Sequence, residues 1–185
     1  MSEPDRKNNI EVEVRSFISP RQHEELTQFF KTNGRFINED YQITYHYFGE
    51  NDLRIQKNNF FAKIWLKKGK MHDQYREEIE IKIDRNDFEK IEAALISLGF
   101  EVSSKWFRKR LNFEWNGVNV MLDFTEGYGY IIEIEKMCLE TEKEKVYEQL
   151  KLMMKELGIE ITPREIFEER FQYYKNNWKK ILGIN

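Results

Sequence analysis

Alternation of apolar and charged residues recurs in about eight short segments of this chain, and it limits the fold more than any other feature of the sequence. The first segment, Ile10 to Val14, reads Ile-Glu-Val-Glu-Val. A period of two places successive side chains on opposite faces of a β-strand. The other segments are Gln42 to Phe48, Leu53 to Gln56, Lys63 to Lys67, Arg76 to Ile83, Arg108 to Phe113, Val118 to Phe124 and Ile131 to Glu135. The turns between them are short, and Asn-Gly at 116–117 is typical of a two-residue hairpin, so we expect antiparallel neighbours.

Four helices are predicted from capping residues and apolar stripes. The first has Ser19 as its N-cap, Pro20 at its first position, Gln22 closing a capping box, and its end at Gly34. The others are predicted over about 86–98 and 141–158, and from a cap at Thr162-Pro163 along the stripe Phe167, Phe171, Tyr174, Trp178 and Ile181. A series of strand, helix and hairpin starts twice, at Ile10 and at Ile79, which suggests two similar halves.

The composition predicts one folded domain over residues 1–185. Hydrophobic residues make up 40% of the chain and aromatic residues 15%, which is enough apolar material to exclude disorder. No apolar run approaches the roughly 18 residues of a membrane span and the N-terminal segment is polar, so we expect a cytoplasmic protein. A single cysteine, Cys138, excludes an internal disulfide, and the net charge of −3 gives no general attraction to nucleic acid or membranes.

The charged faces of the strands either lie in solvent or line an interior. The common arrangement would leave each charged face in water. Four amphipathic helices must also bury their stripes, however, so we favour an α+β fold in which the helices pack on the outside of a closed antiparallel β-barrel of about eight strands with a polar lumen. The lumen bases would be Arg15, Arg54, Lys63, Lys67, Arg76, Lys82, Arg108 and Arg110, and the acids Glu11, Glu13, Glu78, Glu80, Asp123, Glu133 and Glu135.

These two sets of side chains suit one kind of ligand. Arginine and lysine at this density bind a run of phosphates, which arginine can grip with two hydrogen bonds. Glu-x-Glu pairs supply the oxygen ligands that Mg²⁺ or Mn²⁺ prefers. Together they predict a site for a metal-bound polyphosphate, and we expect that removing a lumen base weakens ligand binding more than folding.

The segment Glu11-Val-Glu-Val-Arg15 is similar to the ExExK signature of the CYTH or triphosphate tunnel metalloenzyme superfamily. That superfamily includes class IV adenylyl cyclases, thiamine triphosphatases and inorganic triphosphatases. Further matches follow in the same order over about residues 10–180: Tyr47-Phe48, Leu53-Arg54-Ile55, Leu66-Lys67, Arg76-x-Glu78-x-Glu80, Leu98-Gly99-Phe100, Arg108-x-Arg110, Leu122-Asp123, Gly127-x-Gly129 and Glu133-Ile134-Glu135.

The resemblance implies roles for individual residues in an eight-stranded tunnel. Metal ligands for Mg²⁺ or Mn²⁺ would be Glu11, Glu13, Glu133 and Glu135. The catalytic candidates are Glu11, Glu13 and Arg15, and the substrate-binding candidates are Arg54, Lys63, Lys67, Arg76, Arg108, Arg110, Glu78, Glu80 and Asp123. The chain departs from the family pattern at Arg15 and Arg108, where lysine is frequent, and at Gln56, where many members have arginine.

We expect a triphosphatase that binds a small triphosphate as a monomer or homodimer, and two other functions stay open. One is cyclisation of ATP to cyclic AMP and pyrophosphate, which needs a slot for the base. Candidates for such a slot are Tyr45, Tyr47, Trp65, Trp106, Tyr128 and Tyr130, although aromatic residues in strands are more often packing residues. The other is a polyphosphate or nucleotide binder without turnover. His46 and Cys138 are expected to pack, and the C-terminal helix either docks on the barrel, closes one mouth of it or forms a dimer contact.

Overall fold

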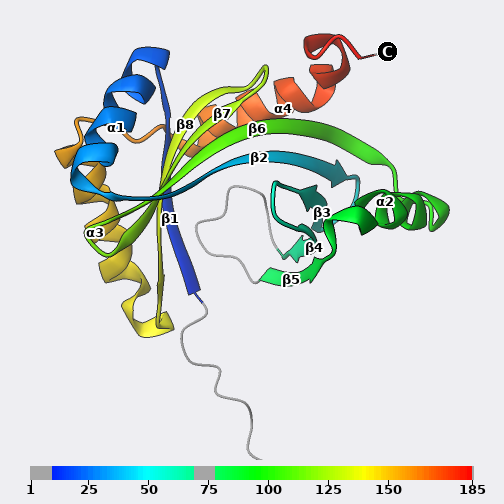
Figure 1. Ribbon diagram of the computed structural model, residues 1–185, viewed down its shortest axis with the longest axis horizontal. Helices are drawn as coiled ribbons and strands as arrows, with labels where there is room; N and C mark the ends of the chain where they lie inside the picture. The colour runs from blue at the N-terminus through cyan, green and yellow to red at the C-terminus, as the bar shows by residue number, and fades with distance from the viewer. Residues whose placement is uncertain (1–9, 69–77, 185) are drawn as a thin grey trace, which may run out of the picture.

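The computed structural model describes residues 10–68 and 78–184, and in these residues one antiparallel sheet of eight strands carries four α-helices (Figure 1). The strands are β1 (Ile10–Ile18), β2 (Arg35–Tyr47), β3 (Asp52–Lys57), β4 (Ala62–Lys67), β5 (Glu78–Ile83), β6 (Val102–Trp115), β7 (Val118–Thr125) and β8 (Gly129–Cys138). The helices are α1 (Pro20–Asn33), α2 (Phe88–Ser97), α3 (Lys143–Glu156) and α4 (Arg164–Ile181), with 3-10 turns η1 (Arg85–Asp87) and η2 (Glu140–Glu142) before α2 and α3.

The sheet is built from two similar halves. The strand order is β1-β8-β7-β6-β2-β3-β4-β5. Along the chain, β1-α1-β2-β3-β4 is followed by β5-α2-β6-β7-β8, and exchanging the halves turns the strand order into its own reverse. The predicted repetition is therefore confirmed, and β2 and β6 lie side by side where the halves meet.

The sheet curls into a half-barrel (Figure 1). The prediction of about eight antiparallel strands in an α+β fold is confirmed, but the predicted closure is not seen: within residues 10–68 and 78–184, β1 and β5 are the edges and do not pair with each other. Strands β3, β4 and β5 have six residues each, against 13 in β2, so the side of the sheet that ends at β5 offers only a short edge to β1. Across the gap, Lys67 Nζ on β4 lies 3.8 Å from Glu11 Oε1 on β1.

Three helices bury the apolar outer face of the sheet. Helices α1 and α3 place Phe30 and Leu150 against Val12 of β1 and Leu122 of β7, and Cys138 lies in the same cluster, as expected for a packing residue. Helix α2 covers β3 and β4 through a second cluster around Phe88. Among the helices in the described ranges, none is both long and apolar enough to cross a bilayer.

The predicted helix starts agree with the structure at α1 and differ at α4. Ser19 and Gln22 form the expected capping box, in which the Ser19 hydroxyl accepts from the Gln22 N–H at 3.1 Å. At α4, by contrast, the Thr162 side chain makes no cap. Its Oγ1 lies 2.8 Å from Ser16 Oγ and accepts from the N–H of Phe17 at 3.0 Å. A contact with a distant strand thus replaces the local cap and ties the segment before α4 to β1.

Helix α4 lies at one end of the concave face and not on the outside, which corrects the expectation that all helices pack outside. It packs against Trp106 of β6 and Ile131 of β8, whose side chains share a face with the inward charged residues of those strands. Tyr174 donates a hydrogen bond to the Lys105 carbonyl at 2.8 Å. The expectation that this helix closes one mouth therefore agrees with its position.

Candidate functional site

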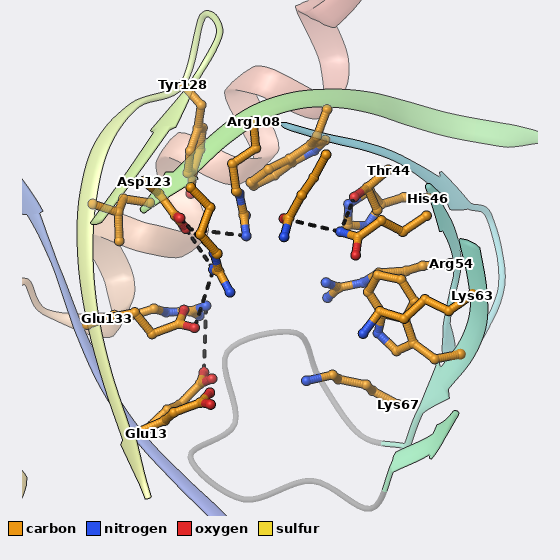
Figure 2. Close-up of a pocket in the computed structure, with 18 of the residues that line it drawn as sticks. Glu13, Thr44, His46, Arg54, Lys63, Lys67, Arg108, Asp123, Tyr128 and Glu133 are labelled. Carbon is orange, nitrogen blue, oxygen red and sulfur yellow. Dashed lines mark hydrogen bonds and ion pairs between the residues drawn. The ribbon is translucent and has the colours of Figure 1, made fainter. Parts of the chain in front are cut away.

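The concave face forms a cavity of about 290 Å³ (Figure 2). Every strand from β1 to β8 contributes to its lining, and α4 contributes Phe167. The period-two assignment of faces was therefore correct for most of the predicted site. The predicted residues that line the cavity are Glu11, Glu13, Arg15, Arg54, Lys63, Lys67, Glu80, Arg108, Arg110, Asp123, Glu133 and Glu135.

Three predicted lumen residues stand apart from this set. Arg76 lies outside the described residues, and so does the side chain of Glu78. Lys82 is exposed and does not line the cavity. Its Nζ lies 4.9 Å from the centre of the Phe61 ring.

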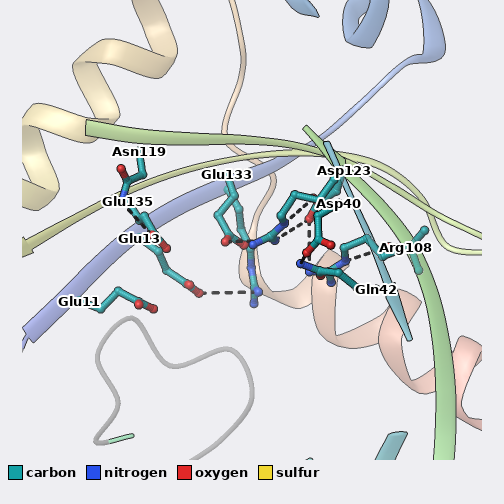
Figure 3. A network of polar contacts seen from close by, with 12 residues as sticks. Glu11, Glu13, Asp40, Gln42, Arg108, Asn119, Asp123, Glu133 and Glu135 are labelled. Atoms are coloured by element: carbon teal, nitrogen blue, oxygen red, sulfur yellow. Dashed lines mark hydrogen bonds and ion pairs between the residues drawn. The ribbon is translucent and has the colours of Figure 1, made fainter. Parts of the chain in front are cut away.

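One wall of the cavity is acidic and comes from the adjacent strands β1 and β8 (Figure 3). Glu13 lies opposite Glu135 in the strand register, and Arg15 lies opposite Glu133. Burial, followed by the charges of Glu133 and Glu11, raises the pKa of Glu135 to about 7. In the described ranges no three acidic, histidine or cysteine side chains converge closely enough to hold a metal ion as they stand. The wall is therefore a set of mutually repelling carboxylates that a cation or a proton would relieve.

The facing wall is basic and comes from β3 and β4. Arg54, Lys63 and Lys67 project from it into the cavity (Figure 2). Lys63 Nζ lies 2.6 Å from Glu80 Oε2 on β5. Opposite Lys63 in the register is Gln56, so a cation lies next to the position where many family members carry a second arginine.

Between the walls, Asp123 of β7 holds two arginines of β6. Arg110 donates from Nε and Nη2 to the two carboxylate oxygens of Asp123, each at 2.7 Å, and Arg108 Nη1 lies 3.3 Å from Asp123 Oδ2. The Asp123 side chain is 2% exposed. Burial favours the neutral acid, but the charges of Arg110 and Arg108 outweigh it and lower the pKa of Asp123. Asp123 is thus an ionised anchor for two guanidinium groups.

His46 on β2 was expected to pack at the surface or in the core. It is buried, its ring centre lies 5.3 Å from that of Trp106, and it also lines the cavity. Its Nδ1 lies 3.8 Å from Asp52 Oδ1, and Arg54 is its register partner on β3. Burial, followed by the positive charge of Arg54, lowers the pKa of His46 to about 4. The imidazole is therefore neutral at pH 7.

This buried imidazole predicts a pH dependence of stability. Because the folded-state pKa lies below the ordinary histidine pKa of 6.5, the unfolded chain binds a proton between about pH 4 and 6.5 that the native state does not bind. We expect the free energy of unfolding of the wild type, relative to a His46→Gln variant, to fall as the pH drops through this window, by an amount on the order of 3 kcal/mol.

Urea unfolding of both proteins at several pH values measures the difference directly, and titration of other groups cancels in the comparison. His23→Gln is a matched control, because the His23 side chain is only half-buried. A difference between wild type and His46→Gln that stays constant from pH 4 to 7.5 would contradict the assignment.

Neutral polar groups of β2 and β3 line the cavity, and those of β2 were not predicted from the sequence. Gln56 donates to Thr44 Oγ1 at 2.9 Å and to Gln42 Oε1 at 3.3 Å, and Gln42 donates to Asp40 at 3.0 Å. The signal for them was present, since Gln42, Thr44 and His46 alternate with apolar residues on β2. Gln56 stands at the position where many family members carry an arginine, so a neutral amide replaces a charge there.

The aromatic candidates for a base slot divide into two groups. Trp65, Trp106 and Tyr128 line the cavity. The remaining candidates, Tyr45, Tyr47 and Tyr130, belong to the outer clusters under the helices. Trp106 is 7% exposed and the Arg108 guanidinium lies 5.5 Å from the centre of its ring, so little of this ring is open to a ligand.

The structure thus defines an α+β protein in which a curled antiparallel sheet encloses a cavity between an acidic and a basic wall. Residues 9–162 match the family model of the CYTH domain. The chain therefore belongs to the CYTH domain family, as its sequence motifs indicated. It is also 29% identical over 161 residues, 81% of this chain and 90% of the relative, to the Methanocaldococcus jannaschii protein named "Putative adenylate cyclase MJ0240".

Solved structures share the fold. A Pyrococcus horikoshii protein, PH1819, has a TM-score of 0.70 and 25% identity over 83% of this chain and 93% of its own. HpAC1 from Hippeastrum, named "Putative adenylyl cyclase" and described as having a dominant triphosphatase activity, has a TM-score of 0.60 and 23% identity over 81% of this chain and 88% of its own. Helix α4 lies beyond the residues matched by the family model.

Proposed function

We propose that this protein is a divalent-metal-dependent triphosphatase that hydrolyses a linear triphosphate, inorganic or organic, and releases orthophosphate. The observation that carries the proposal is the arrangement of charge in the cavity. Arginines and lysines of β3, β4 and β6 face a carboxylate wall of β1 and β8 across one enclosed space. A chain of phosphates bridged to the carboxylates by a metal would neutralise both walls at once.

We expect the bases of the cavity to hold successive phosphates. Arg54 and Lys67 would act from one side, and Arg108 and Arg110 from β6. A diphosphate or monophosphate would leave some of these cations without a phosphate contact. We therefore expect each lost phosphate to weaken binding about tenfold or more.

The carboxylates fit a hard divalent cation by their chemistry. Glu11, Glu13, Glu133 and Glu135 offer only oxygen ligands, the type that Mg²⁺ and Mn²⁺ prefer. Burial and the charges of Glu133 and Glu11 raise the pKa of Glu135, and a bound cation would favour its ionised form. When bound, Mg²⁺ or Mn²⁺ would supply Lewis-acid stabilisation of charge on the phosphate oxygens.

The protein's own groups would supply water activation and orientation. A Glu11 or Glu13 oxygen that is not engaged by metal would orient the attacking water and accept its proton. Arg15 Nη1 lies 3.6 Å from Glu13 Oε1, and its guanidinium lies 4.8 Å from the centre of the Phe167 ring. Because arginine stays protonated, Arg15 would stabilise negative charge and not act as a base.

Cyclisation of ATP is the second candidate function. The name of the 29% identical relative favours it, and so do the aromatic residues Trp65 and Tyr128 in the cavity lining. The buried state of these rings favours hydrolysis, because cyclisation needs base and ribose fixed within near-attack distance. Tyr128 is 8% exposed and Trp65 is 5% exposed.

Incubation with tripolyphosphate, thiamine triphosphate and ATP, each with Mg²⁺ or Mn²⁺, tests the proposal. Release of orthophosphate that stops on addition of a chelator is the expected result. Pyrophosphate from ATP alone would favour the cyclase, and binding of all three without any product would favour a non-catalytic binder.

A further inference from the structure

Asp52 was not among the expected site residues, yet it holds one of the basic groups of the cavity. Arg54 Nε donates to Asp52 Oδ1 at 2.7 Å, and Arg54 Nη2 donates to Asp52 Oδ2. The two residues lie two positions apart on β3, so their side chains share the inward face of the strand. The Asp52 side chain is 9% exposed. A buried two-pronged pair therefore fixes the Arg54 guanidinium.

The other half of the sheet contains a counterpart of this pair. Arg110 uses the same atoms, Nε and Nη2, to hold the two oxygens of Asp123. Arg54 and Asp123 lie on opposite sides of the cavity (Figure 2). Each half of the fold thus presents one arginine to the cavity with its guanidinium held from behind by a buried aspartate.

This geometry leaves part of each guanidinium for a ligand. Arginine has five N–H donors, and the pair with Asp52 uses Nε and one hydrogen of Nη2, so three donors remain. The Arg54 guanidinium also lies 5.5 Å from the centre of the Trp65 ring. An arginine held on two sides has lost much of its side-chain freedom before a phosphate arrives, and such preorganisation favours binding.

We infer that Asp52 is a positioning residue, which holds Arg54 so that its remaining donors meet a phosphate of the substrate. The inference rests on the proposed function, because it takes a phosphate chain as the ligand. The direction in which Asp52 changes anion binding can be tested, because Asp52 itself carries a negative charge. If its charge alone mattered, removing it would strengthen the binding of an anion. If its role is positioning, removing it weakens binding.

Calorimetric titration of tripolyphosphate into the full-length protein, without divalent metal so that no turnover occurs, separates these outcomes. We expect Asp52→Ala to weaken binding about tenfold, as Arg54→Ala does, and Asp52→Asn to lie between, because its amide oxygen can accept one of the two hydrogen bonds. In an Arg54→Ala background, Asp52→Ala should change the affinity by less than about twofold, since the two residues act as a unit.

Tripolyphosphate binding to Asp52→Ala as tight as to wild type, or tighter, would overturn the inference, and so would an equal loss in the Arg54→Ala background. Asparagine has nearly the same volume as aspartate, so Asp52→Asn shows whether binding weakens or strengthens if the alanine variant does not fold. Asp87→Ala is the matched control, because the Asp87 side chain is 42% exposed and pairs with Lys90 on the surface. Wild-type protein that binds tripolyphosphate but does not hydrolyse it after Mg²⁺ or Mn²⁺ is added would refute the triphosphatase proposal alone. Wild-type protein that binds it neither with nor without the metal would refute both.

Discussion

Replacing Glu13 or Glu135 with glutamine is expected to lower turnover of tripolyphosphate at saturating Mn²⁺ by at least about a hundredfold. Glutamine keeps the shape of the side chain and removes the negative charge that a cation or an attacking water would use. The two carboxylates lie opposite each other in the strand register, so either substitution also removes a repulsion between like charges. We therefore expect the melting temperature of each variant to be unchanged or higher.

Steady-state kinetics combined with thermal unfolding checks this prediction. Glu114→Gln is the control, because Glu114 lies on β6 and pairs with Arg35 at the exposed surface. Near-normal turnover in a folded Glu13→Gln or Glu135→Gln protein would remove the metal-ligand assignment from that residue.

Replacing Arg110 with alanine is expected to damage both binding and folding. The substitution removes phosphate contacts worth roughly 1.5 to 3 kcal/mol of binding free energy. It also leaves Asp123, 2% exposed, without its bidentate partner, and loss of one member of a buried pair costs roughly 3 to 5 kcal/mol of stability. Arg108, 3.3 Å from Asp123, would offset part of this loss.

The structure therefore changes an expectation drawn from the sequence, which placed the effect of losing a lumen base mainly on binding. The double variant Arg110→Ala/Asp123→Ala separates the two effects, because it should recover much of the stability and none of the binding. Chemical denaturation and calorimetry supply the two measurements. Arg35→Ala, which breaks an exposed ion pair with Glu114, should change stability by no more than about 1 kcal/mol. Tripolyphosphate affinity equal to wild type in Arg110→Ala would show that this guanidinium does not contact the substrate.

The faces of the strands could be predicted from sequence because they depend on local periodicity. Glu11, Glu13 and Arg15 lie on one side of β1 wherever its neighbours are. The same rule would have placed Gln42, Thr44 and His46 in the cavity. They were not predicted as cavity residues because the prediction used only the charged side chains of each strand.

The partners of these side chains could not be predicted, because they depend on register and on contacts far apart in the chain. The pair of Arg110 with Asp123 follows from the pairing of β6 with β7, in which the two residues lie opposite each other. The neutral state of His46 follows from burial and from Arg54 on the neighbouring strand. Neither fact is present in the pattern of a single strand.

The position of α4 also could not be predicted, because it depends on contacts between residues far apart in the chain. Its stripe of aromatic residues predicted that one face is buried, and Phe171 and Tyr174 are buried. An apolar stripe does not tell which surface covers it. The answer comes from the contact of Thr162 with Ser16, which replaces the predicted cap and directs the helix to the end of the concave face.

Analysis of the products of ATP tests the central claim most directly. Purified protein is incubated with ATP and Mn²⁺, and the nucleotides and phosphates are separated by ion-exchange chromatography. A triphosphatase yields ADP and orthophosphate, and the Glu13→Gln variant yields neither at a measurable rate. Cyclic AMP and pyrophosphate as the main products would contradict the claim and assign the cavity to cyclisation.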